Sequence, residues 1–291
     1  MWATQLGSRG VCPVKLTVLY AHARAKLFAG ALLHRHEVRW VKVGWPIPRT
    51  PLLIAAGGDG TINYAVNHID LGHTRLVVLP LGRGNAFARI FRLSLFAFSP
   101  RQLGRLEERD LPLLEADGRL VVFGAGMGKG SELIEHAKPY SRLGTPSYAA
   151  GALKTLQTPT NCRLHINGQL YPEVLTAEVS LWGRIGLGLP LTGERGPGPY
   201  LTVISGHPLQ AAVKLLSGKV PGWDGAVTVR GERFLLESDH EVPAHIDGET
   251  FRTRRLLVSL SAQRVRFILP RRTANGWGRR GPAGTTDTDH R

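Results

Sequence analysis

The chain has 291 residues, of which 43% are hydrophobic and 20% are charged. These proportions are typical of a globular protein with a buried core, and the length suffices for one large or two ordinary domains. Lys and Arg outnumber Asp and Glu by 37 to 22, so the net charge is +15 and the surface is expected to attract polyanions.

No apolar run approaches the roughly 20 residues that span a bilayer. The first ten residues also lack the apolar core of a signal peptide, so a cytoplasmic location is expected. Cys12 and Cys162 stand far apart without metal-like spacing, which agrees with a reducing compartment.

The first third of the chain alternates between predicted strands and helices, as an α/β domain does. The runs at 52–56 and 75–79 are almost wholly apolar, which is typical of central parallel strands covered on both faces. The predicted strands are 15–20, 37–43, 52–56 and 75–79, and the predicted helices are 23–34, 61–69 and 85–91.

The remainder of the chain is rich in short β-type segments separated by turn residues, which predicts an antiparallel, sandwich-like second domain. These segments are 119–123, 162–166, 173–182, 200–205, 226–229 and 254–261, and one predicted helix at 147–156 interrupts them. A polar stretch at 107–110 sets the predicted boundary. We therefore expect a Rossmann-like α/β domain over 1–108, a β-rich domain over 109–270 and a disordered basic tail over 271–291.

A glycine-rich turn after the apolar strand 52–56 carries the strongest functional signal. The strand is followed by Gly57-Gly58-Asp59-Gly60, and Thr61 is placed to begin the next helix as its N-cap. Glycines let backbone N–H groups approach phosphate oxygens, and the helix N-terminus adds a partial positive charge. Asp59 is placed where a carboxylate binds a phosphate-bound Mg²⁺. Alone, the turn is also compatible with an αβ connection that binds nothing.

A second glycine loop follows the next predicted strand. Gly82 and Gly84 bracket Arg83, and Asn85 and a helix come next. Because both loops follow parallel strands, both are expected at the carboxyl edge of one sheet, where open α/β folds bind ligands. The GxGxxG fingerprint and the Walker A pattern are absent, which argues against the commoner nucleotide folds.

Three motifs together resemble a known family. GGDGTIN at 57–63, LPLGRGNAFAR at 79–89 and HIDGE at 245–249 are similar to motifs of diacylglycerol kinases, sphingosine kinases and bacterial lipid-kinase relatives. The resemblance to NAD kinases, which share the GGDG turn, is more distant. It implies an ATP-dependent lipid kinase in which the α/β domain binds ATP and the β-rich domain supplies the lipid site.

The resemblance also implies residue roles. Asp247 would be the general base that takes the proton from the lipid hydroxyl, Asp59 would serve the Mg²⁺–ATP network, and Glu249 would lie beside Asp247 in the polar and metal network. The implied phosphate contacts are Gly57, Gly58, Gly60, Thr61, Asn63, Gly82, Arg83, Gly84 and Asn85. Phosphoryl transfer needs a carboxylate to receive the acceptor's proton. The local sequence leaves open that Asp247-Gly248 is only a hairpin turn.

Several positions depart from the family pattern. Tyr64 stands where Glu is usual, Arg83 where Thr is usual, and Ala86 where the family has an Asp in its Mg²⁺ network. Arg83 either adds a compensating cation for phosphate or marks a site that has drifted from ATP–Mg²⁺ chemistry.

Three alternatives therefore stay open: a degenerate relative that binds nucleotide or lipid without turnover, an NAD kinase-like activity, and a basic nucleic-acid-binding module. The motifs disfavour the last. The expected partners are a lipid substrate and an anionic membrane surface, with no nucleic acid, and a homodimer is possible.

Overall fold

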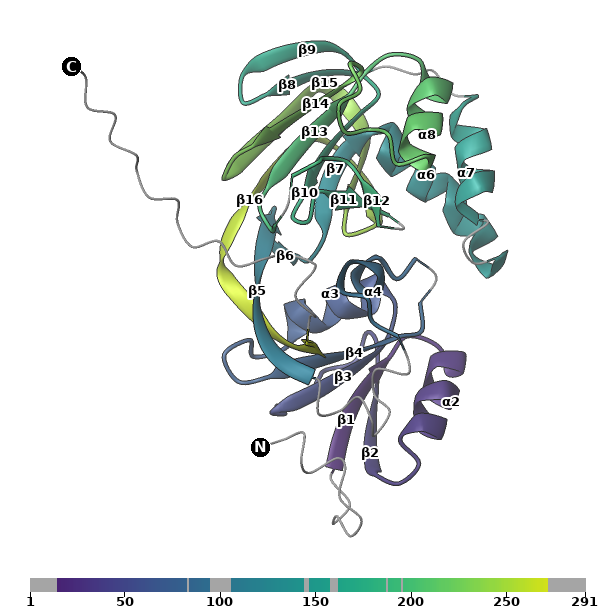
Figure 1. Ribbon diagram of the computed structural model, residues 1–291, viewed down its shortest axis with the longest axis vertical. Coiled ribbons are helices and arrows are strands. Elements are labelled where there is room, and N and C mark those ends of the chain that lie inside the picture. Colours follow the sequence, from purple (N-terminus) through teal and green to yellow (C-terminus); the bar gives the residue numbers. More distant parts are fainter. Residues whose placement is uncertain are drawn as a thin grey trace, which may run out of the picture.

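The computed structural model has an α/β part, at the bottom of Figure 1, and a β-rich part above it. The residues that the structure describes are 15–82, 84–94, 106–143, 147–157, 162–186, 188–194 and 196–271. The fold class predicted from the sequence is confirmed. Arg83, Cys12 and all of the predicted tail except Arg271 lie outside the described residues.

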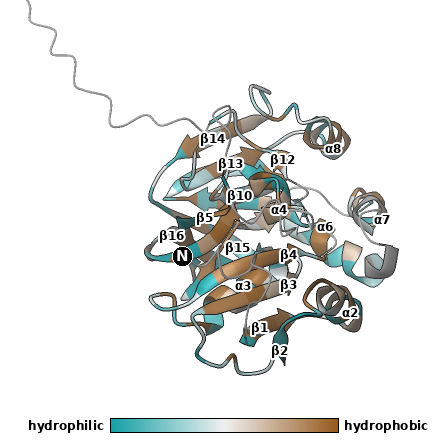
Figure 2. Ribbon diagram, turned by 60° about the horizontal axis from the view of Figure 1, so that its bottom comes forward, coloured by the Kyte–Doolittle hydropathy of each residue, from teal (hydrophilic) through white to brown (hydrophobic). Residues whose placement is uncertain are grey.

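The α/β part contains four parallel strands in the order β4-β3-β1-β2. The strands are β1 (Lys15–Tyr20), β2 (Glu37–Lys42), β3 (Leu52–Gly57) and β4 (Arg75–Pro80), and the helices are α2 (Ala23–Leu32), α3 (Asp59–His68) and α4 (Ala86–Phe91). The interior of β3 and β4 is buried throughout, as their apolar runs predict, and both strands are brown in Figure 2.

One local prediction in this part is wrong. The helix α3 begins at Asp59 with Gly58 as its N-cap, so Thr61 is not the capping residue. The extended backbone of Gly58 starts the helix early, and its carbonyl accepts the N–H of Thr61 at 3.0 Å. Thr61 is therefore inside the first turn and its side chain is buried.

The β-rich part is built from antiparallel strand pairs, as predicted. Its strands are β5 (Leu106–Ala116), β6 (Arg119–Val121), β7 (Gly124–Gly128), β8 (Cys162–Ile166), β9 (Gln169–Val174), β10 (Thr176–Ser180), β11 (Arg184–Ile185), β12 (Leu189–Pro190), β13 (Tyr200–Ile204), β14 (Ala226–Arg230), β15 (Arg233–Ile246) and β16 (Glu249–Pro270).

The sequence predicted one helix in this part, and the structure has more. The helices are α6 (Lys129–Ala137), the 3₁₀ helix η2 (Lys138–Leu143), α7 (Ser147–Thr155) and α8 (Pro208–Leu216). Of these, only α7 was expected. The sequence does contain a start signal for α8 that the prediction did not use. Pro208 occupies the first turn of this helix, where the missing N–H of proline costs nothing.

Two long strands join the two parts. β16 pairs in parallel with β4 through Arg266 and Phe267, and β5 pairs antiparallel with β16. All strands except β11 and β12 therefore belong to one 14-stranded sheet. Residue 108 lies inside β5 rather than in a linker, and Glu108 pairs across strands, with its Oε2 2.6 Å from Arg75 Nε on β4.

The main core also crosses between the parts. One cluster of buried side chains includes Leu53 and Phe87 from the α/β part, Leu164 and Phe234 from the β-rich part, and Phe267 from the strand that joins them. Among the described residues, no helix is long and apolar enough to cross a membrane.

Candidate functional site

The two glycine loops touch at the carboxyl edge of the parallel sheet. A Cβ on Gly82 would lie 2.1 Å from the Cα of Gly58, so only glycine at position 82 permits this contact. The N–H of Leu81 donates to the carbonyl of Gly57 at 2.9 Å. The adjacency that the strand order predicted is therefore present.

Asp59 connects the first loop to the helix after the second. Its Oδ2 accepts the N–H of Ala86 at 3.0 Å, and its Oδ1 accepts the N–H of Phe87 at 3.1 Å. Asp59 thus caps α4, as a carboxylate at a helix N-terminus does. Burial raises the pKa of the Asp59 carboxyl, and these hydrogen bonds oppose that shift.

The polar side chains of the two loops mainly hold the loops in shape. Asn85 has a left-handed backbone, and its side-chain amide makes two hydrogen bonds to the backbone of Gly82. Asn85 Oδ1 accepts the N–H of Gly82 at 3.0 Å, and Asn85 Nδ2 donates to the carbonyl of Gly82 at 2.8 Å. The buried Thr61 lies directly below Gly57, where a Cβ would be 2.1 Å from its Oγ1. Gly60, by contrast, is exposed with open space around it, so the N-terminus of α3 is accessible to an anion.

Asp247 lies in the hairpin turn between β15 and β16. Ile246 pairs with Glu249, and Asp247 and Gly248 both have positive φ, 47° and 86°, as the two-residue turn requires. Asp247 and Gly248 therefore do form a hairpin turn, and the Asp247 side chain also makes contacts outside the turn. The Asp247 carboxylate points onto the β6–β7 connection and accepts three successive backbone N–H groups, those of Val122, Phe123 and Gly124, at 2.7, 2.8 and 3.0 Å.

The first and third motifs meet at this carboxylate. Asn63 Nδ2, in α3, donates to Asp247 Oδ2 at 2.7 Å across 184 positions of sequence, and also to the carbonyl of Leu120 at 3.1 Å. Burial raises the pKa of the Asp247 carboxyl, and the four hydrogen bonds oppose the shift.

Aromatic packing brings the second motif to the same place. Phe87 in α4 lies edge-on to Phe123, with ring centroids 6.1 Å apart, and Phe91 lies edge-on to Trp182 at 5.1 Å. Trp182 donates its indole N–H to the carbonyl of Val122 at 2.8 Å, so it supports the segment that holds Asp247. All three motifs are therefore physically connected.

Part of the chain is similar to known diacylglycerol kinases. Residues 31–108 match the family model described as the diacylglycerol kinase catalytic domain. The resemblance to diacylglycerol kinases is confirmed. A diacylglycerol kinase of Bacillus subtilis (strain 168) is 30% identical over 145 residues, which span 46% of this chain and 48% of that protein.

Solved structures of diacylglycerol kinase-type proteins share the fold. A diacylglycerol kinase from Bacillus anthracis str. Sterne has a TM-score of 0.64 and 17% identity, over 88% of this chain and 96% of that one. Another diacylglycerol kinase-type structure from the same organism has a TM-score of 0.65 and 16% identity, over 88% of this chain and 97% of that one. An NAD kinase from Archaeoglobus fulgidus in complex with ATP has a TM-score of only 0.47 and 13% identity, over 88% of this chain and 94% of that one.

The structure shows the contacts of two residues that depart from the diacylglycerol kinase pattern, Tyr64 and Ala86. Tyr64 donates its hydroxyl to the carbonyl of Trp45 at 3.0 Å and stacks on His68 at 3.9 Å. Its side chain is half-buried and packs against the main core. Ala86 is buried and offers only its backbone N–H, to Asp59.

The predicted metal donors do not gather into one site. The Glu249 side chain is 72% exposed and lies 3.6 Å from Arg119, whereas Asp59 is directed at α4. Within the described part of the chain, no three His, Cys, Asp or Glu side chains are placed to hold a metal ion together. The arrangement does not fit a preformed Mg²⁺ site on Asp59 and Glu249.

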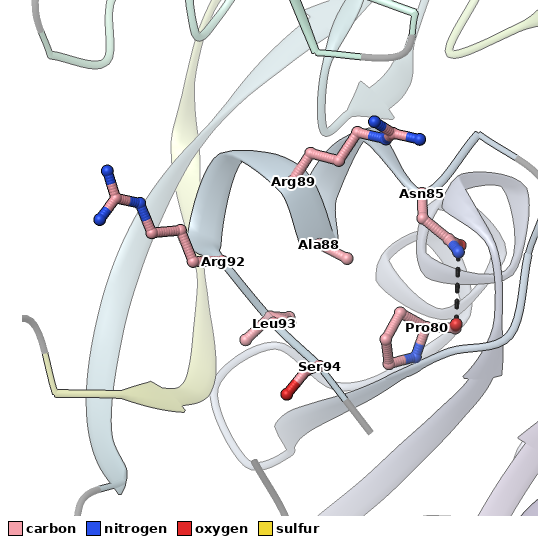
Figure 3. Close-up of a pocket in the computed structure, with 7 residues that line it drawn as sticks. All are labelled: Pro80, Asn85, Ala88, Arg89, Arg92, Leu93 and Ser94. Carbon is pink, nitrogen blue, oxygen red and sulfur yellow. Dashed lines mark hydrogen bonds between the residues drawn. The ribbon is translucent and has the colours of Figure 1, made fainter. Parts of the chain in front are cut away.

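A pocket of about 470 Å³ opens beside the second glycine loop (Figure 3). Its lining consists of Pro80, Asn85, Ala88, Arg89, Arg92, Leu93 and Ser94. Arg89 and Arg92 extend away from each other at its rim, and Arg89 Nε donates to the carbonyl of Gly84 at 3.2 Å. Arg89 is the last residue of the second motif, and no role was predicted for it.

A buried ion pair close to Asp247 was also missed. His245 Nε2 lies 2.9 Å from Glu178 Oε2, and both side chains are almost fully buried. Glu178 on β10 and His245 on β15 both pair with Gly126 of β7, the strand between them. A Cβ at position 126 would lie 2.3 Å from Glu178 Oε2, so the glycine lets the two side chains meet over β7. The available signal was an acidic residue, Glu178, inside the predicted strand 173–182.

Proposed function

We propose that this protein is an ATP-dependent lipid kinase that transfers the γ-phosphate to the hydroxyl of a diacylglycerol-like lipid. The observation that carries the proposal is the 2.7 Å contact between Asn63 and Asp247, because it joins the glycine-loop motif to the predicted base. The match of residues 31–108 to the diacylglycerol kinase catalytic domain supports it independently.

The chemistry follows from the residues present. ATP supplies the phosphoryl group, and the exposed N-terminus of α3 at Gly60 offers backbone donors to phosphate oxygens. As the lipid oxygen bonds to phosphorus, its proton passes to Asp247 and the bond to the ADP oxygen breaks. A carboxyl whose pKa is raised by burial is a stronger base than an exposed one. Because the carboxylate is already held by four donors, its oxygens are fixed in position.

In this proposal Mg²⁺ enters the site bound to the phosphates of ATP. Mg²⁺ commonly keeps several waters and binds through one or two carboxylates plus substrate phosphates. Asp59 accepts the N–H of Ala86 and Glu249 lies beside Arg119, so these two side chains do not form a joint site for the ion.

The experiment is transfer of labelled γ-phosphate from ATP and Mg²⁺ to a panel of lipids, with NAD as one further acceptor. We expect lipid phosphorylation by the wild type and a loss of at least about 100-fold in Asp247→Asn, the lower range for removing a general base. The control is Asp239→Asn, which changes an exposed carboxylate on the same strand and should leave the rate unchanged.

Thermal unfolding and ATP binding of both variants show whether Asp247→Asn is folded. A folded Asp247→Asn with wild-type activity would refute the role of the base. Phosphorylation of NAD and of no lipid would instead establish the NAD kinase-like alternative.

A degenerate relative that binds without turnover is the second candidate. The supporting observation is that the carboxylate oxygens of Asp59 and Asp247 both accept hydrogen bonds from backbone N–H groups of the protein itself. This candidate predicts ATP binding by the wild type with no transfer to any acceptor.

A further inference from the structure

Strand β7 contributes side chains to only one face of the sheet. Its sequence is GAGMG, so Ala125 and Met127 point into the main core and the opposite face is all glycine. A glycine-rich strand specifies its pairing register weakly, because few side chains distinguish one alignment from the next. β15 also meets β7 over only the residues Ala244, His245 and Ile246. The register of β15 on β7 therefore needs support from outside β7.

The buried Glu178–His245 pair provides a contact that spans β7. Glu178 on β10 and His245 on β15 both lie opposite Gly126, and their Oε2 and Nε2 atoms meet at 2.9 Å. The contact therefore links three neighbouring strands at one level of the sheet. It forms only when both side chains stand opposite the same glycine.

His245 has no second polar contact that would orient it. Its other ring nitrogen, Nδ1, is buried without a hydrogen-bond partner in the described part of the chain. Glu178, in contrast, is held in place, because its Oε1 accepts the hydroxyl of Thr176 at 2.9 Å. Helix α6 closes over the pair, since a Cβ on Gly130 in its first turn would lie 2.3 Å from Glu178 Oε1.

Burial makes other alignments of β15 unfavourable. The side chains of Glu178 and His245 are only 3 and 6% exposed, so water does not replace either partner. A slip of β15 by one residue would turn the His245 side chain to the other face and leave Glu178 as an unpaired buried charge. Such a charge is strongly destabilising. The pair thus penalises the alignments that the glycines of β7 leave open.

The predicted base depends on the same alignment. Asp247 follows His245 by two residues, and its own N–H donates to the carbonyl of Gly124 at 2.9 Å. Its carboxylate accepts the N–H groups of Val122, Phe123 and Gly124, which lead into β7. A one-residue slip would move Asp247 about 3.3 Å along β7 and away from these donors.

We propose that the Glu178–His245 pair sets the register of β15 on the glycine-rich strand β7 and thereby positions Asp247 over its three backbone donors. The inference rests on the proposed function, because it assigns two positioning residues to the base of that reaction. Neither residue touches the reacting atoms. Buried ion pairs often stabilise a fold no more than apolar side chains of similar volume, but they can select one alignment over others.

The main test is the double variant Glu178→Leu and His245→Leu. It removes both charges together and leaves neither one unpaired, so its thermal unfolding temperature should be at least that of the wild type. The rate constant kcat for lipid phosphorylation should nevertheless fall at least about 10-fold, toward the roughly 100-fold that a misplacement of about 1 Å costs. The KM for ATP should stay unchanged, because the glycine loops are not altered.

Two further variants separate positioning from stability. Glu178→Gln still offers His245 a hydrogen-bonding side chain, so it should keep kcat close to the wild-type value even though it lowers stability. The matched control, Thr202→Val with Thr228→Val, removes a hydroxyl contact of 3.1 Å between β13 and β14 of the same sheet. It should leave kcat unchanged. If activity followed stability across these variants, or if the double leucine variant did not fold, the proposal would be overturned.

Amide hydrogen exchange of Val122, Phe123 and Gly124, followed by NMR, gives a readout that needs no catalysis. We expect these three amides to be protected in the wild type and in Glu178→Gln, and to exchange faster in the double leucine variant. Unchanged protection in the double leucine variant would overturn the proposal, whatever its kcat. If the wild type transferred no phosphate, the kinase proposal would fail, while faster exchange in the double variant would still establish the register role of the pair.

Discussion

At the scale of single residues, the Glu178–His245 pair shows how a buried charge is accommodated next to the predicted base. Glu178 Oε1 accepts the hydroxyl of Thr176 at 2.9 Å, and Glu178 Oε2 contacts His245 Nε2. Burial lowers the pKa of His245, but the charge and hydrogen bond of Glu178 and the charge of Asp247 outweigh it, so the net shift is upward. Glu178 therefore favours the charged form of the imidazole over the neutral one.

This pair makes stability depend on pH. Because the folded pKa of His245 is raised above its unfolded value, the stabilisation is complete below about pH 6.5 and is lost as the pH rises through the folded pKa. Glu178→Gln should lower the free energy of unfolding by about 3 kcal/mol at pH 6, and by less at higher pH. Urea unfolding of both proteins between pH 6 and 8.5 measures the difference.

The matched control for this prediction is Glu237→Gln. Glu237 lies on the same strand as His245, but its partner is Arg255 at 3.7 Å and both side chains are exposed. An exposed pair contributes less than about 1 kcal/mol, with little pH dependence in this window. If the two variants gave equal losses at every pH, the role assigned to His245 would be incorrect.

At the scale of elements, the short helix α4 depends on a residue from another loop. Its N-cap, Asn85, makes no side-chain cap, and Asp59 accepts the N–H groups of Ala86 and Phe87 instead. An amide offers one acceptor oxygen in place of two, so Asp59→Asn leaves one of these donors facing an NH₂ group.

We therefore expect Asp59→Asn to lower the free energy of unfolding by about 1 kcal/mol, with a wider range of roughly 0.5–2, as for other lost helix caps. Nucleotide affinity should fall as well, because α4 carries the second glycine loop. Urea unfolding and a nucleotide titration measure the two effects. Unchanged stability would mean that Asp59 does not cap α4 in solution.

At the scale of the whole molecule, β5 and β16 make the two parts interdependent. β16 supplies the edge partner of β4, and Phe267 from β16 packs on Phe87 of α4, with ring centroids 4.6 Å apart. A fragment that ends at residue 108 lacks β16 and most of β5. The α/β segment would then expose β4 as an unpaired, apolar edge strand.

Accordingly, a fragment of residues 15–108 should fail to fold cooperatively, whereas the full chain should unfold in one transition. Circular dichroism with heating and limited proteolysis compare the two. A fragment with a sharp transition of its own would show that residues 1–108 form an autonomous domain, as the sequence predicted.

Much of the fold was predictable because its signals are local. The apolar runs of β1, β3 and β4 fixed a parallel sheet, and parallel strands place their following loops at one edge. The missed elements were those whose pattern is set by distant neighbours. β7, with the sequence GAGMG, has no strand propensity of its own, and it is a strand because β10 and β15 flank it.

The sequence by itself determined the three motifs, their order and the hairpin at Asp247-Gly248, because glycine turns and Asp-Gly hairpins depend on backbone conformations that only a few residues adopt. Only the tertiary structure decided which partners these residues have. It directed Asp59 to α4, joined Asn63 to Asp247 across 184 positions, and left Glu249 exposed beside Arg119. Hydrogen bonds between distant segments depend on how strands and helices pack, and no local pattern records that packing.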